Sequence, residues 1–257
     1  MAPRVDLKQG ETKKHIARAL KSLRDGYVIV APLEHGYVYL ADAFSPFAVR
    51  AMHVLRGDEL GVASQVLGHS AQTIEGITRE ISEDAQAMMD QFWPGMLSLT
   101  LKTNRSLNWD LGDDQALDVV SVRVPKSRFV RALLKESGPL AVASASPAGS
   151  EPMLKLNRTQ LKEWDIAVAF DNGALKSGPS SSIVDFSEGQ PRIIRAGAIS
   201  VAEMTEVVPL ISGQYLLGWR PCPKLSMAQI SHFYRSKIQI SQVCSFQNLR
   251  DNRPIFS

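Results

Sequence analysis

The chain has 257 residues, 44% of them hydrophobic and 21% charged, with a formal net charge of +3. This composition is ordinary for a globular protein, and the length suits one large domain with an appendage. No apolar run is long enough to cross a bilayer, and Cys222 and Cys244 lack the spacing of a zinc site or a disulfide framework. Residues 1–15 lack the apolar core of a signal peptide, so we expect a cytoplasmic protein without membrane contact.

The charge is unevenly distributed along the chain. Residues 214–257 contain six Lys or Arg and one acidic residue, so residues 1–213 contain 23 basic and 25 acidic residues. We therefore predict a near-neutral domain at residues 1–213 and a basic C-terminal extension at residues 214–257 that is poorly ordered. Aromatic side chains lie between the basic ones of this extension, a pattern that also suits contact with RNA.

Apolar residues in the first half of the chain alternate between helical and strand spacing. Helices are predicted at residues 10–24, 46–55 and 83–92, and strands at residues 27–32, 37–44, 62–68 and 97–103. The turn at residues 33–36 places Glu34 beside His35. Such a pair can transfer protons, but we interpret it as a solvated turn.

Residues 118–149 predict a strand–helix–strand unit. A β-branched run at residues 119–124 is followed by a helical pattern from Phe129 to Leu134 and by a second apolar strand at residues 140–145. Such units normally give two parallel neighbouring strands joined by a right-handed crossover. Further along, a helical piece is predicted at residues 158–164, strands within residues 166–173, 177–186 and 191–200, and a helix at residues 201–211.

Interleaved strands and helices, with seven or eight strands, indicate a single α/β or α+β domain. The Gly-rich fingerprint of dinucleotide-binding proteins, the Walker loop and the nucleophile elbow are all missing from the sequence. Arg123 lies within an apolar strand, and small hydroxyl residues follow the strand at residues 140–145. Two interpretations stay open for this region: an anion site, or a solvated strand edge beside an ordinary turn.

Several motifs occur in the order found in one known family. They are YVIVAPLEHGYVYLADA, WPGMLSLTL, VSVRVPKSRFVRALL, GPLAVASASPAG, SGPSSSIVDF and RIIRAGAI. Together they resemble the YrdC-like threonylcarbamoyl-AMP synthase family over about residues 14–210. The resemblance implies an α/β fold, a twisted mixed sheet flanked by helices with a deep basic cleft. It also implies a nucleotidyltransferase that makes threonylcarbamoyl-AMP and pyrophosphate from threonine, bicarbonate and ATP with Mg²⁺.

The product of that family serves the threonylcarbamoyladenosine modification of tRNA, so tRNA or double-stranded RNA and other tRNA-modification proteins are implied partners. This chemistry needs no protein nucleophile and no resident metal, but it needs cations and hydroxyls that gather anionic groups. The resemblance implies catalytic roles for Arg56 and Arg123, substrate binding by Tyr37, Gln65, Arg123 and Ser181, and nucleotide binding by Arg56, Ser144, Ser146 and Arg195. We expect these groups to converge on one anion-lined cavity.

The sequence departs from the family pattern at several of these positions. The departures are Leu33, His35, Asp58, Glu59, Gln65 and Ser146. Asp58 and Glu59 would place two carboxylates where the resemblance expects a triphosphate. At ~4 Å an uncompensated like-charge contact costs ~1 kcal/mol in water. The alternative hypothesis is therefore a non-catalytic member of the same fold that binds a nucleotide or RNA.

Overall fold

The computed structural model describes residues 2–116, 118–156, 165–209 and 211. The helices in these ranges are α1 (Thr12–Arg24), α2 (Pro46–Arg56), α3 (Ala71–Ile77), α4 (Glu83–Phe92), α5 (Arg128–Ser137) and α6 (Val201–Val207). The strands are β1 (Arg4–Asp6), β2 (Val28–Pro32), β3 (Tyr37–Asp42), β4 (Gln65–Leu67), β5 (Thr78–Arg79), β6 (Leu97–Thr103), β7 (Val119–Arg123), β8 (Leu140–Ser144), β9 (Ile166–Asp171), β10 (Ser182–Asp185) and β11 (Arg192–Arg195).

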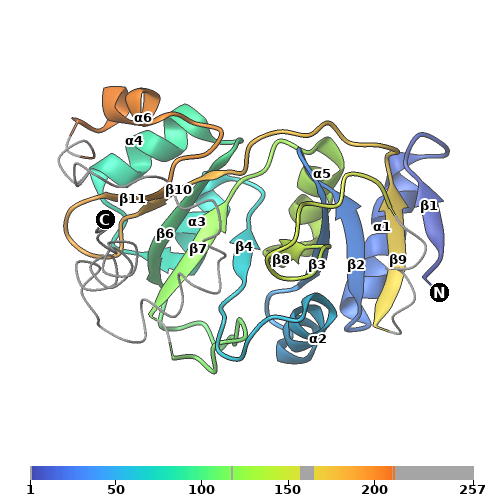
Figure 1. Cartoon of the computed structure of the whole chain (residues 1–257). Coiled ribbons are helices and arrows are strands. Elements are labelled where there is room, and N and C mark those ends of the chain that lie inside the picture. Colours follow the sequence, from blue (N-terminus) through green and yellow to red (C-terminus); the bar gives the residue numbers. More distant parts are fainter. Residues whose placement is uncertain (1, 117, 157–164, 210, 212–257) are drawn as a thin grey trace, which may run out of the picture.

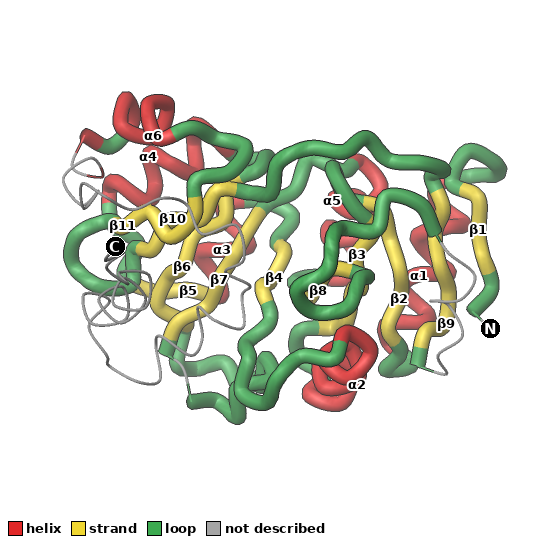
Figure 2. The backbone as a smooth tube through the Cα atoms, in the orientation of Figure 1, coloured by secondary structure: helices red, strands yellow, loops and turns green. Residues whose placement is uncertain are grey.

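All the described strands belong to one mixed sheet. Its order is β1-β9-β2-β3-β8-β4-β7-β6-β10-β11, with β5 paired to β6 outside this path. Parallel and antiparallel pairs are interspersed, and the three-residue β4 lies alone between two larger groups of strands in Figure 2. The predicted α/β class and the twisted mixed sheet flanked by helices are confirmed; the deep basic cleft stays a prediction.

Two hydrophobic clusters lie on opposite faces of the sheet. The larger one includes Met52 from α2, Ile74 from α3, Met88 from α4 and Met204 from α6. The smaller one packs apolar residues of α1 and α5 against β2, β3, β4, β8 and β9. In Figure 1 α1 and α5 lie together behind β2 and β3, whereas α4 and α6 lie together at the end that carries β11.

Serine side chains fix where four helices begin. The hydroxyls of Ser45, Ser70, Ser82 and Ser200 accept the backbone N–H of the third residue of α2, α3, α4 and α6, respectively. Each bond satisfies one of the free N–H groups in a first helical turn. The last helix adds a full capping box, because the carboxylate of Glu203 also accepts the Ser200 N–H.

The structure corrects the predicted strand–helix–strand unit. β7 and β8 are not neighbours: β4 lies between them, parallel to β7 and antiparallel to β8. A strand from an earlier part of the chain thus pairs with the edges of β7 and β8 that were expected to pair with each other. A pattern within residues 118–149 cannot reveal this insertion. β1, α3 and β5 were not predicted, because each is short. The predictions for residues 158–164 and for the extension at residues 214–257 lie outside the described residues.

Candidate anion-binding site

The smaller hydrophobic cluster ends at β4, and the same face of the sheet then becomes polar. Leu97, Leu99 and Leu101 of β6 point into the larger cluster on the opposite face. Because side chains alternate along a strand, the intervening Ser98 and Thr100 point to the other side. The valines of β7 likewise leave Ser121 and Arg123 on that side. We call this region, on β4, β7, β6, β10 and β11, the polar half-face.

Hydrogen bonds connect side chains of several strands across the polar half-face. The Gln65 Nε2 donates to the Ser98 Oγ at 2.9 Å and to the Ser121 Oγ at 3.0 Å. The Ser98 Oγ in turn donates to the Ser181 Oγ at 3.1 Å. Ser98 and Ser181 are buried, so each unpaired hydroxyl would cost free energy. The chain of bonds therefore fixes the orientation of these groups before any ligand binds.

Arg195 continues this chain from β11. Its Nε donates to the Ser181 carbonyl oxygen at 2.9 Å and its Nη2 to the Ser181 Oγ at 3.2 Å. Burial lowers the pKa of the Arg195 guanidinium, and the positive charge of Arg123 lowers it further. Within the described residues Arg195 forms no ion pair. Two guanidinium groups thus face one region, and one of them lacks a countercharge.

Arg123 is held at the end of β7 by two oxygen acceptors. Its Nε donates to the Gly95 carbonyl oxygen at 2.8 Å, and its Nη2 donates to the Glu34 Oε2 at 2.6 Å. Its side chain is only 7% exposed. Gly95 must be a glycine, because a Cβ there would lie 2.0 Å from the Phe92 carbonyl oxygen. The buried guanidinium predicted from the sequence therefore has a carboxylate partner that the sequence did not identify.

The turn that carries Glu34 is anchored to its surroundings on two sides. The other Glu34 oxygen accepts the Lys126 N–H, and the Ser127 Oγ donates to the Pro32 carbonyl oxygen at 3.0 Å. On the opposite side the His35 Nδ1 lies 3.1 Å from the Lys176 carbonyl oxygen. The interpretation of this turn as solvated is therefore wrong for Glu34, whose side chain is 12% exposed.

Arg56 belongs to a second polar group at the end of α2. Its Nε lies 3.2 Å from Asp58, and the other oxygen of Asp58 lies 2.9 Å from the His53 Nδ1. The Asp58 side chain is 3% exposed, so the expected uncompensated carboxylate is instead a buried, paired one. The Arg56 carbonyl oxygen accepts the Ala148 N–H at 3.0 Å, which ties this group to the loop after β8 that contains Ser146.

The structure brings together some of the predicted site residues and separates others. Arg123, Ser181, Arg195 and Gln65 lie on the polar half-face, whereas Arg56 lies beside the loop after β8. Ser144, opposite Val38 in the sheet, shares the face of Val142 and Gln65. The expected single cavity that contains all of them stays a prediction.

Tyr37 is placed elsewhere. It is completely buried in the larger cluster, and its hydroxyl oxygen lies 2.8 Å from the Asp171 Oδ1 and 2.7 Å from the Gly173 carbonyl oxygen, which share its single proton. The Asn172 N–H donates to the same hydroxyl. Burial raises the pKa of the Tyr37 hydroxyl, and the neighbouring Asp171 carboxylate acts in the same direction. The resemblance implied that Tyr37 lies beside Arg123, but in the structure the two side chains lie on opposite faces of the sheet.

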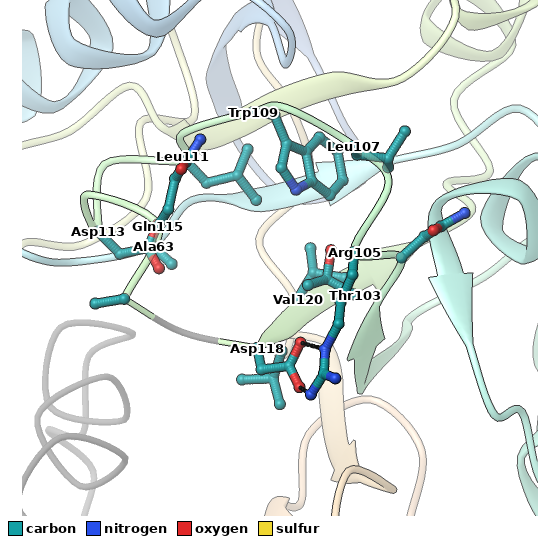
Figure 3. Close-up of a pocket in the computed structure, with 13 residues that line it drawn as sticks. Ala63, Thr103, Arg105, Leu107, Trp109, Leu111, Asp113, Gln115, Asp118 and Val120 are labelled. Carbon is teal, nitrogen blue, oxygen red and sulfur yellow. Dashed lines mark hydrogen bonds and ion pairs between the residues drawn. The ribbon is translucent and has the colours of Figure 1, made fainter.

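A cavity of about 240 Å³ lies beneath the loop that joins β6 to β7. Its walls include Leu107, Trp109 and Leu111, and Arg105 forms an ion pair with Asp118 at its rim (Figure 3). Thr103 and Asp118, which also line it, lie at the end of the β6–β7 pair opposite Arg123. None of its lining residues is a predicted site residue, so the cavity is distinct from the polar half-face.

The described residues contain no group of three or more His, Cys, Asp or Glu side chains that could hold a metal ion. The Mg²⁺ expected from the resemblance would arrive with ATP, whose phosphate oxygens are its usual ligands. Across the same ranges, no helix combines the length and the hydropathy that a membrane span requires.

Comparison with known proteins identifies related sequences. Residues 21–197 match the Sua5/YciO/YrdC family, whose description reads "Telomere recombination". A protein of Mycobacterium leprae, provisionally named a threonylcarbamoyl-AMP synthase, is 38% identical over 198 residues, which are 76% of this chain and 89% of that protein. The threonylcarbamoyl-AMP synthase of Bacillus subtilis is 27% identical over 195 residues, 75% of this chain and 56% of that protein.

Solved structures show the same fold. Sua5 of Pyrococcus abyssi, crystallised with L-threonine, matches with a TM-score of 0.72 and 25% identity. The match covers 82% of this chain and 62% of that one, so the chain spans about three fifths of the archaeal protein. E. coli YciO matches with a TM-score of 0.67 and 20% identity over 79% of this chain and 98% of that one.

Proposed function

The chain belongs to the Sua5/YciO/YrdC family, and we propose that it makes threonylcarbamoyl-AMP from L-threonine, bicarbonate and ATP. The observation that supports this most is the pair of guanidinium groups on one polar face: Arg123 is buried, and half-buried Arg195 bonds to the Ser181 hydroxyl. Two of the three substrates are anions and the third is a zwitterion. A site of this kind matches their shared need for cationic and hydroxyl partners.

The reaction needs positioning more than covalent catalysis. The ammonium group of threonine first loses a proton to solvent. The neutral amine then attacks bicarbonate and forms a carbamate with loss of water. Next, a carbamate oxygen attacks the α-phosphorus of ATP as the bond to pyrophosphate breaks. Negative charge moves onto the leaving pyrophosphate during the second step. In our proposal Arg123 and Ser181 orient the amino acid, while Arg195 and Arg56 contact the nucleotide with its Mg²⁺.

The product suits a role in the threonylcarbamoyladenosine modification of tRNA. We extend the proposal to this pathway because relatives named threonylcarbamoyl-AMP synthase match most of the chain. Under this proposal the polar half-face serves the small-molecule reaction. Contact with tRNA belongs to another surface, and the basic residues 214–257 are the candidate.

The alternative, a non-catalytic nucleotide- or RNA-binding protein, rested on four departures from the family pattern: Asp58, Glu59, Leu33 and His35. Pairing of Asp58 with Arg56 and His53 offsets the charge of the first of these residues. Because that carboxylate is already compensated, it presents less repulsion to a triphosphate than an isolated one would. The observation favours the enzyme over the binding protein.

The test is pyrophosphate release from ATP in the presence of Mg²⁺, L-threonine and bicarbonate. We expect release that depends on both threonine and bicarbonate, and a loss of about 10²–10³-fold in kcat/KM for Arg123→Ala. Arg105→Ala is the matched control, because Arg105 lies on the surface in an exposed ion pair with Asp118. ATP binding without release would support the non-catalytic alternative, and equal rates for the two variants would contradict the assigned site.

A further inference from the structure

Glu34 places a carboxylate against the buried Arg123. One of its oxygens accepts the Arg123 Nη2, and the other accepts the Lys126 N–H. An ionised carboxylate has about four acceptor positions, so these two bonds leave about two of them free. The side chain keeps 12% of its surface exposed, which leaves a path for a ligand donor. Glu34 is therefore fixed in position while some of its hydrogen-bond acceptor positions stay open to a ligand.

This carboxylate changes the charge that the polar half-face presents. Arg123 is offset by Glu34, whereas Arg195 forms no ion pair among the described residues. A site for an anion alone would gain nothing from a carboxylate, which repels anions by ~1 kcal/mol at ~4 Å even in water. A ligand that carries both charges fits this arrangement, because positive and negative groups of the protein lie next to each other.

An α-amino acid is such a ligand, since its ammonium and carboxylate groups are attached to the same carbon atom. We propose, on the basis of the proposed function, that Glu34 binds the ammonium group of the amino-acid substrate while the adjacent Arg123 guanidinium binds its carboxylate. Glu34 is then a specificity-determining residue: it selects a zwitterion over a plain carboxylate of the same shape. A charge-assisted hydrogen bond is about twice as strong as a neutral one, which gives the selection its strength.

A second role for Glu34 has to be separated from this one. Glu34 also holds the turn at residues 33–36 against the start of α5, so its loss could disturb Arg123 indirectly. Glu34→Gln keeps the size of the side chain and one oxygen that can accept the Lys126 N–H, but removes the charge. An indirect effect through Arg123 would weaken every carboxylate ligand equally, whereas loss of ammonium recognition affects only ligands that carry an amine.

The experiment is calorimetric titration with two probes, with Mg²⁺ and a non-hydrolysable ATP analogue present. The probes are L-threonine and 2,3-dihydroxybutanoate, in which a hydroxyl replaces the amine. For Glu34→Gln we expect at least a tenfold loss of threonine affinity, with affinity for the hydroxy acid unchanged or higher. Glu136→Gln, an exposed charge removal on α5, should match the parent protein for both probes.

Each remaining outcome contradicts a specific statement. An equal loss for both probes would show that Glu34 acts only by placing Arg123, and unchanged threonine affinity would show no contact with the ammonium group. Either result overturns the inference but leaves the proposed function in place. Failure of the parent protein to bind threonine would overturn the proposed function itself, and the role of Glu34 with it.

Discussion

The two halves of the sheet are both built from mixed strands, but they differ in the side chains that cover their faces. In the half formed by β1, β9, β2, β3 and β8, apolar side chains occupy both faces, with α2 on one side and α1 and α5 on the other. In the half formed by β7, β6, β10 and β11, one face is apolar and the other holds serines and arginines. The place of a strand in the sheet does not tell whether it belongs to the apolar half or to the proposed site. The side chains at every second position of the strand, polar or apolar, do tell.

Buried polar groups also differ between the halves. In the apolar half Tyr37 and Asp171 bind each other, nearby backbone groups and Arg4, so the set is complete in itself. In the polar half Arg195 is paired only with Ser181 within the described residues, and its pKa is lowered by burial and by Arg123. A cation that is partly desolvated and lacks a countercharge is one that an incoming anion stabilises.

The largest expected effect is a loss of stability from a substitution in the apolar half. Phe170 of β9 is completely buried, with its ring centroid 4.8 Å from that of Phe129 on α5. We expect Phe170→Ala to lower the free energy of unfolding by about 3–5 kcal/mol, because it removes apolar contacts and leaves a cavity. Denaturant titration measures the loss. The folded fraction should keep its kcat/KM; a falling kcat/KM would show that the halves are not independent.

Two adjacent serines, Ser181 and Ser182, test the difference between the two faces of the sheet at β10. The Ser181 Oγ contacts Ser98 and Arg195 on the polar half-face, whereas the Ser182 Oγ on the opposite face binds the backbone of Gly197 and Ile199. We expect Ser181→Ala to lower kcat/KM about tenfold, since one hydroxyl of the proposed site is lost, and to lower the free energy of unfolding by about 1–3 kcal/mol, because the buried Ser98 hydroxyl loses its acceptor.

Ser182→Ala is the matched variant for this prediction. It should lower the free energy of unfolding by about 1–3 kcal/mol, because the buried Ile199 N–H and the part-buried Gly197 N–H lose their acceptor, and should leave kcat/KM unchanged. Thermal unfolding and pyrophosphate release, measured on both variants, check the pair. Reversed effects would place the site on the other face of the sheet.

The smallest expected effect depends on pH. Burial raises the pKa of Asp171, but hydrogen bonds from the Gly173 N–H, the Tyr37 hydroxyl and Arg4 outweigh it, so the net shift is downward. A carboxyl whose folded pKa is lowered contributes stability above its unfolded pKa of about 3.9, and this contribution is lost as the pH falls through the folded value. Asp171→Asn should therefore cost about 1–2 kcal/mol at pH 7.

The difference between Asp171→Asn and the parent protein should shrink as the pH falls below about 4, where the carboxyl becomes protonated in the unfolded chain first and in the folded protein only at lower pH. Urea titrations of both proteins between pH 3 and pH 7 measure this difference. A difference that stays constant over the range would show that the ionised form of Asp171 contributes no stability. Activity at pH 7 should not change, since Asp171 belongs to the apolar half.

Sequence patterns were sufficient for the long elements and for the buried cation. Helices α1, α4 and α5 have strong apolar periodicity, and Arg123 stood out because a guanidinium within an apolar strand requires a partner. The order of the strands could not be predicted, because β4 pairs with residues more than fifty positions away. Glu34 was missed because its partner is distant in sequence and a lone acid in a turn is normally solvated.

Ser98 and Ser121 were also missed, although a signal was present. Both occupy alternate positions in strands that are otherwise buried and apolar, in LSLTLKT and in VVSVR. Polar residues at every second position of two such strands indicate one shared polar face. The position of Tyr37 could not be predicted from the sequence pattern, because alternation along β3 does not tell which of the two hydrophobic clusters that cover the strand receives its side chain.

The three residues of β4 impose a practical limit on anyone who redesigns this protein. Among the described strands they form the one that pairs with both halves of the sheet, and they also present the Gln65 amide to Ser98. A slip of one position in that strand would turn the Gln65 amide toward the larger hydrophobic cluster and an apolar side chain toward the polar half-face. Substitutions or insertions there cannot be optimised for robustness and for turnover separately, so mutational libraries are better directed at the loops that flank it.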